Sequence, residues 1–157
     1  MEIKFGIITC SDTRTIEEDT AGAFLEQSIK DNGWQCLNHE VVKDNIEAIS
    51  NAIIKNVDEF MCDIVLTCGG TGLSPKDVTP EATQKVCQRN VSGIAEAMRA
   101  YGLKITPNAA LSRALCMQRG TCLVINFPGS EKAAKENWEA ACPMLEHAVK
   151  MSQGGGH

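Results

Sequence analysis

The stretch LTCGGTGLSPKDVTPEA, residues 66–82, decides how the rest of this sequence is interpreted. It begins inside an apolar run, Asp63–Thr67, which predicts a buried strand. Glycine then occupies three of the four positions from 69 to 72. Such a dense cluster lowers loop stability and is typical of a loop whose bare N–H groups closely approach an anion. A simple tight turn from a strand into a helix is the alternative.

The second half of the stretch carries charge and predicts the start of a helix. Lys76 and Asp77 place opposite charges side by side. Thr79 is a favourable N-cap, Pro80 is favourable at the first helical position, and Glu81 is favourable at the positive end of the helix dipole. The order of strand, glycine loop, charged pair and helix indicates a site for a phosphorylated ligand.

The loop matches neither of the two common nucleotide-binding motifs. A Walker loop has Gly-Lys-Ser or Gly-Lys-Thr after its glycines, whereas Gly72 is followed here by Leu73-Ser74-Pro75. A dinucleotide fingerprint requires a further glycine where Pro75 stands. Spacing alone therefore indicates an anion site without naming its ligand.

The composition describes one acidic globular domain. The chain has 157 residues, of which 43% are hydrophobic and 22% charged, and its net charge is −5. We expect a single domain over residues 1–151 and a flexible tail over 152–157. The acidic balance argues against binding to nucleic acid or to an anionic membrane, and no apolar run approaches the roughly 20 residues of a membrane-spanning helix. The first residues predict a strand and lack a signal-peptide pattern, so we expect a cytoplasmic protein.

The cysteine pattern agrees with a reducing compartment. The chain has eight cysteines but no Cys-x-x-Cys pair. Most of them stand among apolar residues, so we interpret them as small core side chains and not as disulfides or zinc ligands.

Hydrophobic patterns predict strands that alternate with helices. Strands are expected at Lys4–Cys10, Gln35–Val42, Asp63–Thr67 and Thr121–Asn126. A first helix is expected after Gly22, through Phe24, Leu25 and Ile29, ending at Asn32-Gly33. Further helices are expected at Ile46–Phe60, Pro80–Arg89, Ser92–Gly102, Asn108–Gly120 and 131–150, with Pro143 kinking or splitting the last. This alternation predicts an α/β fold of three αβα layers around a mostly parallel central sheet.

A polar loop follows each of the four expected strands. They are Ser11-Asp12, the loop of Asp44, the glycine loop with Asp77, and Pro128-Gly129-Ser130. In parallel sheets the ligand binds outside the carboxyl ends of the strands, so we expect these loops to meet at one edge. Two carboxylates beside a polyphosphate predict Mg²⁺ between them. The alternatives are a capping box of Asp44 with Glu47, and an ion pair of Asp77 with Lys76 or Arg113.

Three segments resemble one known family. They are GGTGLSPKDVTPEA at 69–82, Leu111-Ser112-Arg113 followed by Gly120 and the run VINFPGS at 124–130, and Ser11-Asp12. Together they resemble the molybdenum-cofactor biosynthesis domain of the MogA, MoaB and gephyrin G-domain type. The resemblance covers nearly the whole chain and implies a molybdopterin-binding-like fold. It also implies transfer of AMP from ATP to the terminal phosphate of molybdopterin, with release of pyrophosphate.

The resemblance further implies a role for each matching residue. Those that would bind or flank the nucleotide are Gly69, Gly70, Thr71, Gly72, Asn126, Pro128, Gly129, Ser130, Ser11 and Asp12. Those that would contact molybdopterin are Ser112, Arg113 and Lys76. Asp44 and Asp77 would be the catalytic acids and would hold Mg²⁺. The family also implies a homotrimer, and a molybdate-inserting protein as a candidate partner that takes the product.

The first loop departs from the adenylyltransferase pattern. After Ser-Asp that pattern has an arginine, a glycine four places on, and then Asp and Gly. Here Thr15 to Glu18 contain no glycine, although Asp19 and Gly22 are retained. This form is more like the MoaB branch. A non-catalytic protein that binds molybdopterin or its nucleotide in the same pathway is therefore the alternative to an active enzyme, and an unrelated kinase-like phosphotransferase is a weaker one.

Overall fold

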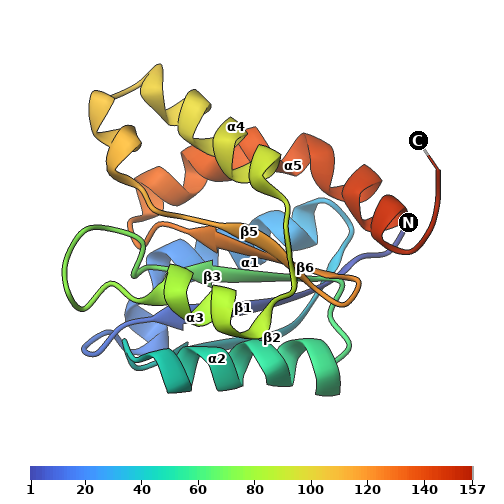
Figure 1. Cartoon of the computed structure of the whole chain (residues 1–157), viewed down its shortest axis with the longest axis horizontal. Helices are drawn as coiled ribbons and strands as arrows, with labels where there is room; N and C mark the ends of the chain where they lie inside the picture. Colours follow the sequence, from blue (N-terminus) through green and yellow to red (C-terminus); the bar gives the residue numbers. More distant parts are fainter. Residues whose placement is uncertain (157) are drawn as a thin grey trace.

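The computed structural model describes residues 1–156, which fold around one six-stranded sheet (Figure 1). The strands are β1 (Lys4–Cys10), β2 (Gln35–Val42), β3 (Ile64–Cys68), β4 (Arg89–Asn90), β5 (Cys116–Arg119) and β6 (Cys122–Phe127). Their order across the sheet is β2-β1-β3-β6-β5-β4. Strands β2, β1, β3 and β6 are parallel to one another, and β5 is antiparallel to both of its neighbours. The predicted α/β class with a mostly parallel sheet is confirmed.

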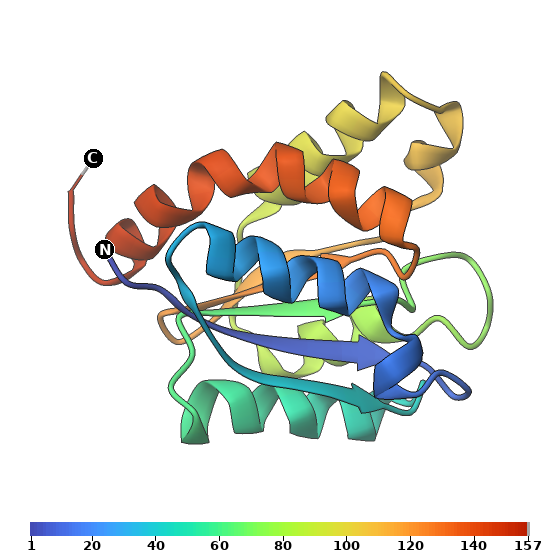
Figure 2. The same ribbon diagram turned by 180° about the vertical axis from the view of Figure 1, so that it is seen from behind.

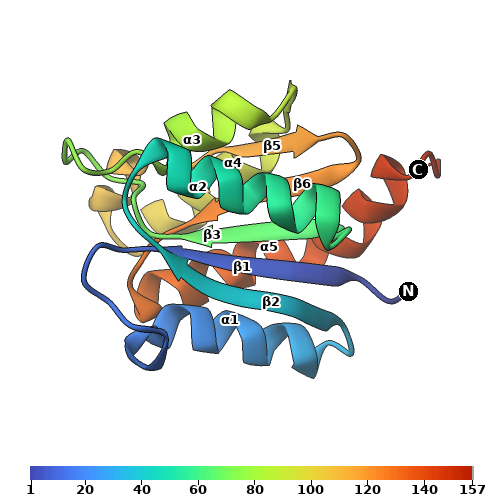
Figure 3. The same cartoon turned by 90° about the horizontal axis from the view of Figure 1, so that it is seen from below.

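Helices cover both faces of the sheet (Figures 2 and 3). The α-helices are α1 (Thr20–Asp31), α2 (Ile46–Ile54), α3 (Thr79–Val86), α4 (Ser92–Leu103) and α5 (Glu131–Ser152). A π-helical turn, η2 (Lys55–Glu59), continues α2, and short 3-10 turns form η1 (Ile16–Glu18) and η3 (Pro107–Leu111). Helices α1, α4 and α5 contribute to the core on one face, and α2 and α3 to the core on the other.

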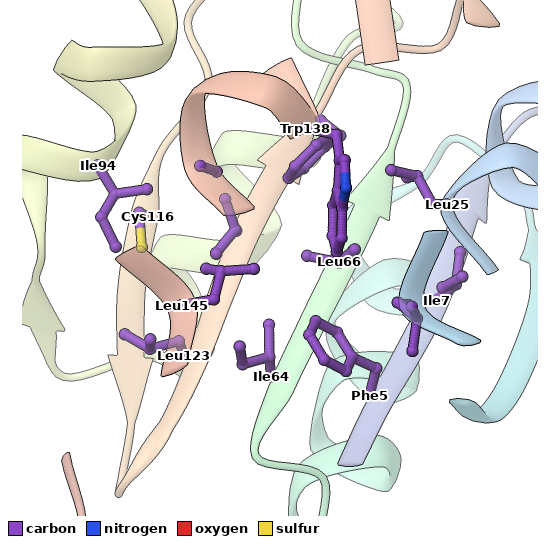
Figure 4. Close-up of a cluster of buried hydrophobic side chains, with 14 of the residues drawn as sticks. Phe5, Ile7, Leu25, Ile64, Leu66, Ile94, Cys116, Leu123, Trp138 and Leu145 are labelled. Carbon is purple, nitrogen blue, oxygen red and sulfur yellow. The ribbon is translucent and has the colours of Figure 1, made fainter. Parts of the chain in front are cut away.

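The two cores follow from the alternation of side chains along the strands. On one face Phe5 and Leu66 pack with Trp138 of α5 (Figure 4). On the other face Ile8 and Val65 pack against α2 and α3. Burying large apolar side chains on both faces explains why the central strands read as continuous apolar runs in the sequence.

One predicted helix is wrong. The spacing of Leu111 and Leu115 predicts a helix from Asn108 to Gly120, but the chain forms the short turn η3 and then strand β5. Gly120 has φ +59, a left-handed conformation that closes a tight hairpin between β5 and β6. Pairing with β6 therefore overrides the apparent helical period.

Smaller predictions at helix ends are also corrected. Asn45, and not Asp44, caps α2, because its side chain accepts a hydrogen bond from Ala48 N. Val78 holds the N-cap position of α3, so Thr79 is the first residue of that helix, which ends at Val86. Helix α5 continues through Pro143, so the predicted split is wrong, while a kink at Pro143 stays a prediction.

The structure also shows the state of the cysteines and of the C-terminal residues. The eight cysteines are free thiols, and five of them are buried: Cys10, Cys62, Cys68, Cys116 and Cys122. In the expected tail, Gly154 N and Gly155 N donate back to the end of α5, while His157 lies outside the described residues. None of the helices within residues 1–156 combines the length and hydrophobicity needed to cross a membrane.

Candidate functional site

The carboxyl ends of the four parallel strands lie at one edge of the sheet. Cys10 is opposite Val42, Thr9 is opposite Cys68, and Cys68 is opposite Phe127. The loops that follow these strands therefore meet at this edge, where those after β1 and β3 extend beyond the sheet on the left of Figure 3. The chain termini lie at the other end.

The glycine loop, residues 69–78, needs its first two glycines for its own backbone. Gly69 has φ +96 and Gly70 has φ +70, which L side chains rarely adopt. A Cβ on Gly69 would lie 2.8 Å from Cys10 O, and one on Gly70 would lie 2.3 Å from Thr79 Oγ1. Gly69 N donates to Phe127 O at 2.9 Å. This N–H is thus used inside the protein, and anion binding by this loop would fall to the N–H groups that follow.

The loop after β6 packs directly on the glycine loop. A Cβ on Gly129 would lie 3.3 Å from the Cα of Gly69, so the two backbones are in contact. Arg14 Nη1, from the loop after β1, donates to Gly129 O at 3.1 Å. Three loops that are far apart in the sequence are thereby held together.

Three carboxylates gather beside these loops. Asp44 N donates to Asp12 Oδ1 at 3.0 Å, which joins the loops after β1 and β2. A Cβ on Gly72 would lie 2.9 Å from Asp77 Oδ2, so the Asp77 carboxylate lies against the glycine loop. Burial raises the pKa of Asp44, and the negative charges of Asp12 and Asp77 raise it further. The two predicted catalytic acids are therefore close enough to interact electrostatically.

One oxygen of this cluster has no partner. Asp44 Oδ1 is buried and accepts no hydrogen bond from any residue in the described part of the chain. Buried carboxylate oxygens are normally paired, because leaving one unpaired is energetically costly. Because Asn45 caps α2, the Asp44 carboxylate does not serve as the cap of that helix. Its unpaired oxygen is suited to bind a cation.

The carboxylates fit Mg²⁺ only together with a ligand. Among residues 1–156, no three His, Cys, Asp or Glu side chains form a complete metal site. Mg²⁺ typically takes one or two carboxylates and completes its shell with water and phosphate oxygens. Two lysines lie nearby: Lys43 Nζ donates to Asp12 O at 3.0 Å, and Lys76 Nζ is 3.8 Å from Asp12 Oδ2.

Arg113 lies between η3 and β5 and forms hydrogen bonds with the glycine loop. Its backbone N donates to Thr71 O at 2.8 Å, and its side chain donates to Gly72 O at 2.8 Å and Asp77 O at 2.7 Å. It also forms an ion pair with Glu81 at 2.6 Å. Contact with molybdopterin stays a prediction for this residue, and its observed partners are those of the loop.

Asn126 is buried beneath the edge. Its Oδ1 accepts from Leu115 N at 3.0 Å, and its Nδ2 donates to the hydroxyls of Thr67 and Thr83 at 2.9 and 3.0 Å. These bonds tie β6 to β3, to α3 and to the residue just before β5. Ser130, also predicted for the nucleotide, caps α5 by accepting from Ala133 N.

A cavity of about 340 Å³ lies beside the glycine loop. Four predicted site residues line it: Thr71, Gly72, Ser112 and Pro128. The opposite wall comes from α4, η3 and the start of α5, and includes Met98, Arg99, Glu136 and Asn137. Two larger cavities, of about 600 and 720 Å³, have none of the predicted site residues in their walls. The 340 Å³ cavity is therefore the space in which residues predicted for the nucleotide and for molybdopterin meet.

The sequence analysis missed a buried polar network next to this edge. Asp19 accepts from Thr9 Oγ1 at 2.5 Å, from His39 Nε2 at 2.6 Å and from Gly22 N at 2.9 Å. His39 Nδ1 also lies 2.9 Å from Glu26 Oε1. The retained Asp19 was the only sequence signal, since nothing in the pattern pairs it with a residue on β2.

Comparison with known proteins identifies relatives over almost the whole chain. A family model described as a probable molybdopterin binding domain matches residues 6–147. A Helicobacter pylori protein named molybdopterin adenylyltransferase is 38% identical over 156 residues, covering 97% of this chain and 89% of the relative. A Bacillus cereus protein named molybdenum cofactor biosynthesis protein B is 37% identical, covering 85% and 80%.

Solved structures give the same result. The molybdopterin biosynthesis enzyme MoaB from Thermus thermophilus is 39% identical, with a TM-score of 0.89 and 97% of each chain covered. A structure of MogA is 30% identical, with a TM-score of 0.89 and 95% of this chain and 99% of that chain covered.

Proposed function

Since this chain belongs to the family of the probable molybdopterin binding domain, which serves molybdenum cofactor biosynthesis, we propose that it is a molybdopterin adenylyltransferase. It would transfer AMP from ATP to the terminal phosphate of molybdopterin and release pyrophosphate. The observation that carries this proposal is the unpartnered Asp44 oxygen within electrostatic range of Asp77 and the glycine loop. Loops that served only the fold would have no need for a buried carboxylate oxygen without a hydrogen-bond partner.

The residues at the edge have complementary tasks in this reaction. Asp44 and Asp77 would hold Mg²⁺, which would neutralise negative charge on the triphosphate. N–H groups of the glycine loop and the N-terminus of α3 would orient the phosphates. The terminal phosphate oxygen of molybdopterin then forms a bond to the α-phosphorus as the bond to pyrophosphate breaks. This in-line exchange needs positioning and charge stabilisation, with no covalent bond to the protein.

The decisive assay mixes purified protein with molybdopterin, ATP and Mg²⁺, and measures pyrophosphate together with adenylylated molybdopterin. We expect the two products in equal amounts. Asp77→Asn should reduce the rate on the order of a hundredfold, because its charge no longer assists the metal. Asp31→Asn is a matched control, since Asp31 is exposed and contacts Gln27 on α1.

One observation favours a second candidate, a MoaB-like binding protein without turnover. The glycine of the adenylyltransferase pattern is absent from the first loop, where Ile16–Glu18 form η1 under a capping box of Thr15 and Glu18. Molybdopterin or ATP binding with no product from the unmodified protein would support this candidate. Transfer of the γ-phosphate would contradict both.

A further inference from the structure

Arg113 connects the two ends of the glycine loop's exposed turn. Its Nε donates to Gly72 O, and its Nη2 donates to Asp77 O, five residues further along. Between these two points the chain turns outward, and Leu73 is 66% exposed. The guanidinium therefore closes the base of the turn that carries Asp77.

Glu81 completes this arrangement from the first turn of α3. Its carboxylate accepts from Arg113 Nη1 at 2.6 Å and from Nη2 at 3.3 Å. Every nitrogen of the guanidinium thus has a partner within the protein. The ion pair also lowers the pKa of Glu81, and the hydrogen bond from Arg113 is the largest cause of this shift.

The Asp77 carboxylate is oriented within the same turn. Ser74 N donates to Asp77 Oδ2 at 3.1 Å, and Asp77 N donates to Ser74 O at 2.9 Å. Arg113 fixes the backbone of Asp77, and this local turn fixes its side chain. A shift at the Arg113 contact would consequently move the carboxylate relative to Asp44.

We propose that Arg113 and Glu81 form a positioning pair, which holds residues 72–77 so that Asp77 faces Asp44. In this proposal Arg113 acts through the loop, in place of the predicted contact with molybdopterin. This inference rests on the proposed adenylyl transfer and refines it. Arg113 would hold the loop in position, and the positive charges of Lys76 and Lys43 would interact with the phosphates.

The geometry requires arginine. The fork donates in three directions at once, to two carbonyls and a carboxylate. A lysine supplies the same charge from one nitrogen and cannot reach all three acceptors. A phosphate-binding residue would tolerate lysine much better, since its charge would be preserved.

This difference gives the test. We expect Arg113→Lys to lower kcat on the order of 10- to 100-fold, while KM for ATP and for molybdopterin changes less than about twofold. Glu81→Gln should cause a smaller loss of kcat. The double variant should lose no more than Arg113→Lys alone, because both substitutions break the same unit.

Hydrogen exchange supplies a readout that does not depend on turnover. The N–H groups of Asp77 and Thr79 are hydrogen-bonded within the loop region. They should exchange faster in Arg113→Lys than in the unmodified protein at equal overall stability. If the unmodified protein made no adenylylated product, the proposed function would fail, and this exchange rate would still decide whether Arg113 holds the loop.

Arg119→Lys is the matched control. Arg119 forms the same kind of fork, with two bonds to Asp58 and one to Val86 O, but no predicted site residue is among its partners. We expect it to lower stability and leave kcat per folded molecule unchanged. Unchanged loop exchange in Arg113→Lys, or a rise in KM of tenfold or more at constant kcat, would overturn the positioning role.

Discussion

Two aspartates at the carboxyl edge of the sheet have opposite environments. Asp19, at the start of α1, is buried, and its two oxygens accept from Thr9, His39 and Gly22. Asp44, after β2, has one oxygen that is buried without a partner among residues 1–156. One carboxylate is fully used by the fold, and the other is not.

The pKa values of the two groups move in opposite directions for this reason. Burial acts to raise the pKa of Asp19, but the hydrogen bonds from His39, Thr9 and Gly22 outweigh it, and the pKa is lowered. Burial also raises the pKa of Asp44, and there the charges of Asp12 and Asp77 add to the effect. Asp19 therefore stabilises the fold as an anion, whereas ionised Asp44 destabilises it.

The comparison separates residues that build the edge from residues that act at it. A partly buried carboxylate with an unpaired oxygen lowers stability, and such groups concentrate at functional sites. The same amide substitution at both positions should then have opposite consequences for folding and for activity.

The largest effect is expected from Asp44→Asn. Adenylyl transfer should fall on the order of a hundredfold or more, because the carboxylate that would bind Mg²⁺ becomes a neutral amide. Stability at neutral pH should stay the same or rise, since the folded state no longer holds a carboxylate whose ionised form is disfavoured. Product formation and urea denaturation measure the two quantities. A normal rate, or a large loss of stability, would show that Asp44, like Asp19, serves the fold and not the reaction.

Asp19→Asn should mainly reduce stability. The amide removes the charge that His39 and Thr9 donate to, at a cost of about 2 kcal/mol in the free energy of unfolding. The rate per folded molecule should fall less than tenfold, because Asp19 does not belong to the acidic cluster. Urea denaturation with parallel activity measurements tests this. A rate loss as large as that of Asp44→Asn at unchanged stability would contradict the distinction.

The sequence could predict Asp44 but not the partners of Asp19. Apolar runs located the four parallel strands, and the position of Asp44 directly after a strand then placed it at the edge. His39 is 20 residues from Asp19 and reaches it only after β2 pairs with β1. Partners that the fold brings together leave no local pattern.

Arg113 shows the same limit for a residue that the family resemblance did select. The resemblance implies a contact with molybdopterin, whereas the acceptors that the fold places around Arg113 are backbone carbonyls of the glycine loop and the Glu81 carboxylate. Strand β5 begins three residues after Arg113, and the leucine and methionine spacing of this segment predicts a helix because the pairing of β5 with β4 and β6 leaves no local signal. Contacts between residues far apart in the sequence therefore determine both the partners of Arg113 and the strand conformation of β5.

A smaller effect, on the pH dependence of stability, is expected from His39→Gln. His39 faces Asp19 and Glu26, and Glu26 pairs in turn with Lys30. Burial acts to lower the pKa of His39, but the hydrogen bonds to the two acids outweigh it, and the pKa is raised. Its contribution is therefore complete below the unfolded value of about 6.5 and is lost as the pH rises through the folded value.

Urea denaturation across this pH range measures that contribution. The unmodified protein should lose stability as the pH rises from mildly acidic to alkaline, and His39→Gln should lose less over the same range. At mildly acidic pH the variant should be less stable by about 1 kcal/mol. Asp19→Asn should also flatten the profile, because it removes one of the two acids. An unchanged slope in both variants would show that His39 is not charged in this network.

The smallest effect is expected from Asp12→Asn, which tests why Asp44 differs from Asp19. The amide oxygen can still accept from Asp44 N, so only the charge is removed. The pKa of Asp44 should fall but stay raised, because burial is the larger cause and remains. Since ionised Asp44 destabilises the folded state, stability at neutral pH should rise by a few tenths of a kcal/mol. Carboxyl-carbon NMR titration gives the pKa, with Asp31→Asn as the control. A pKa of Asp44 that does not move would mean that burial alone sets it, and the carboxylates would then not act as one cluster.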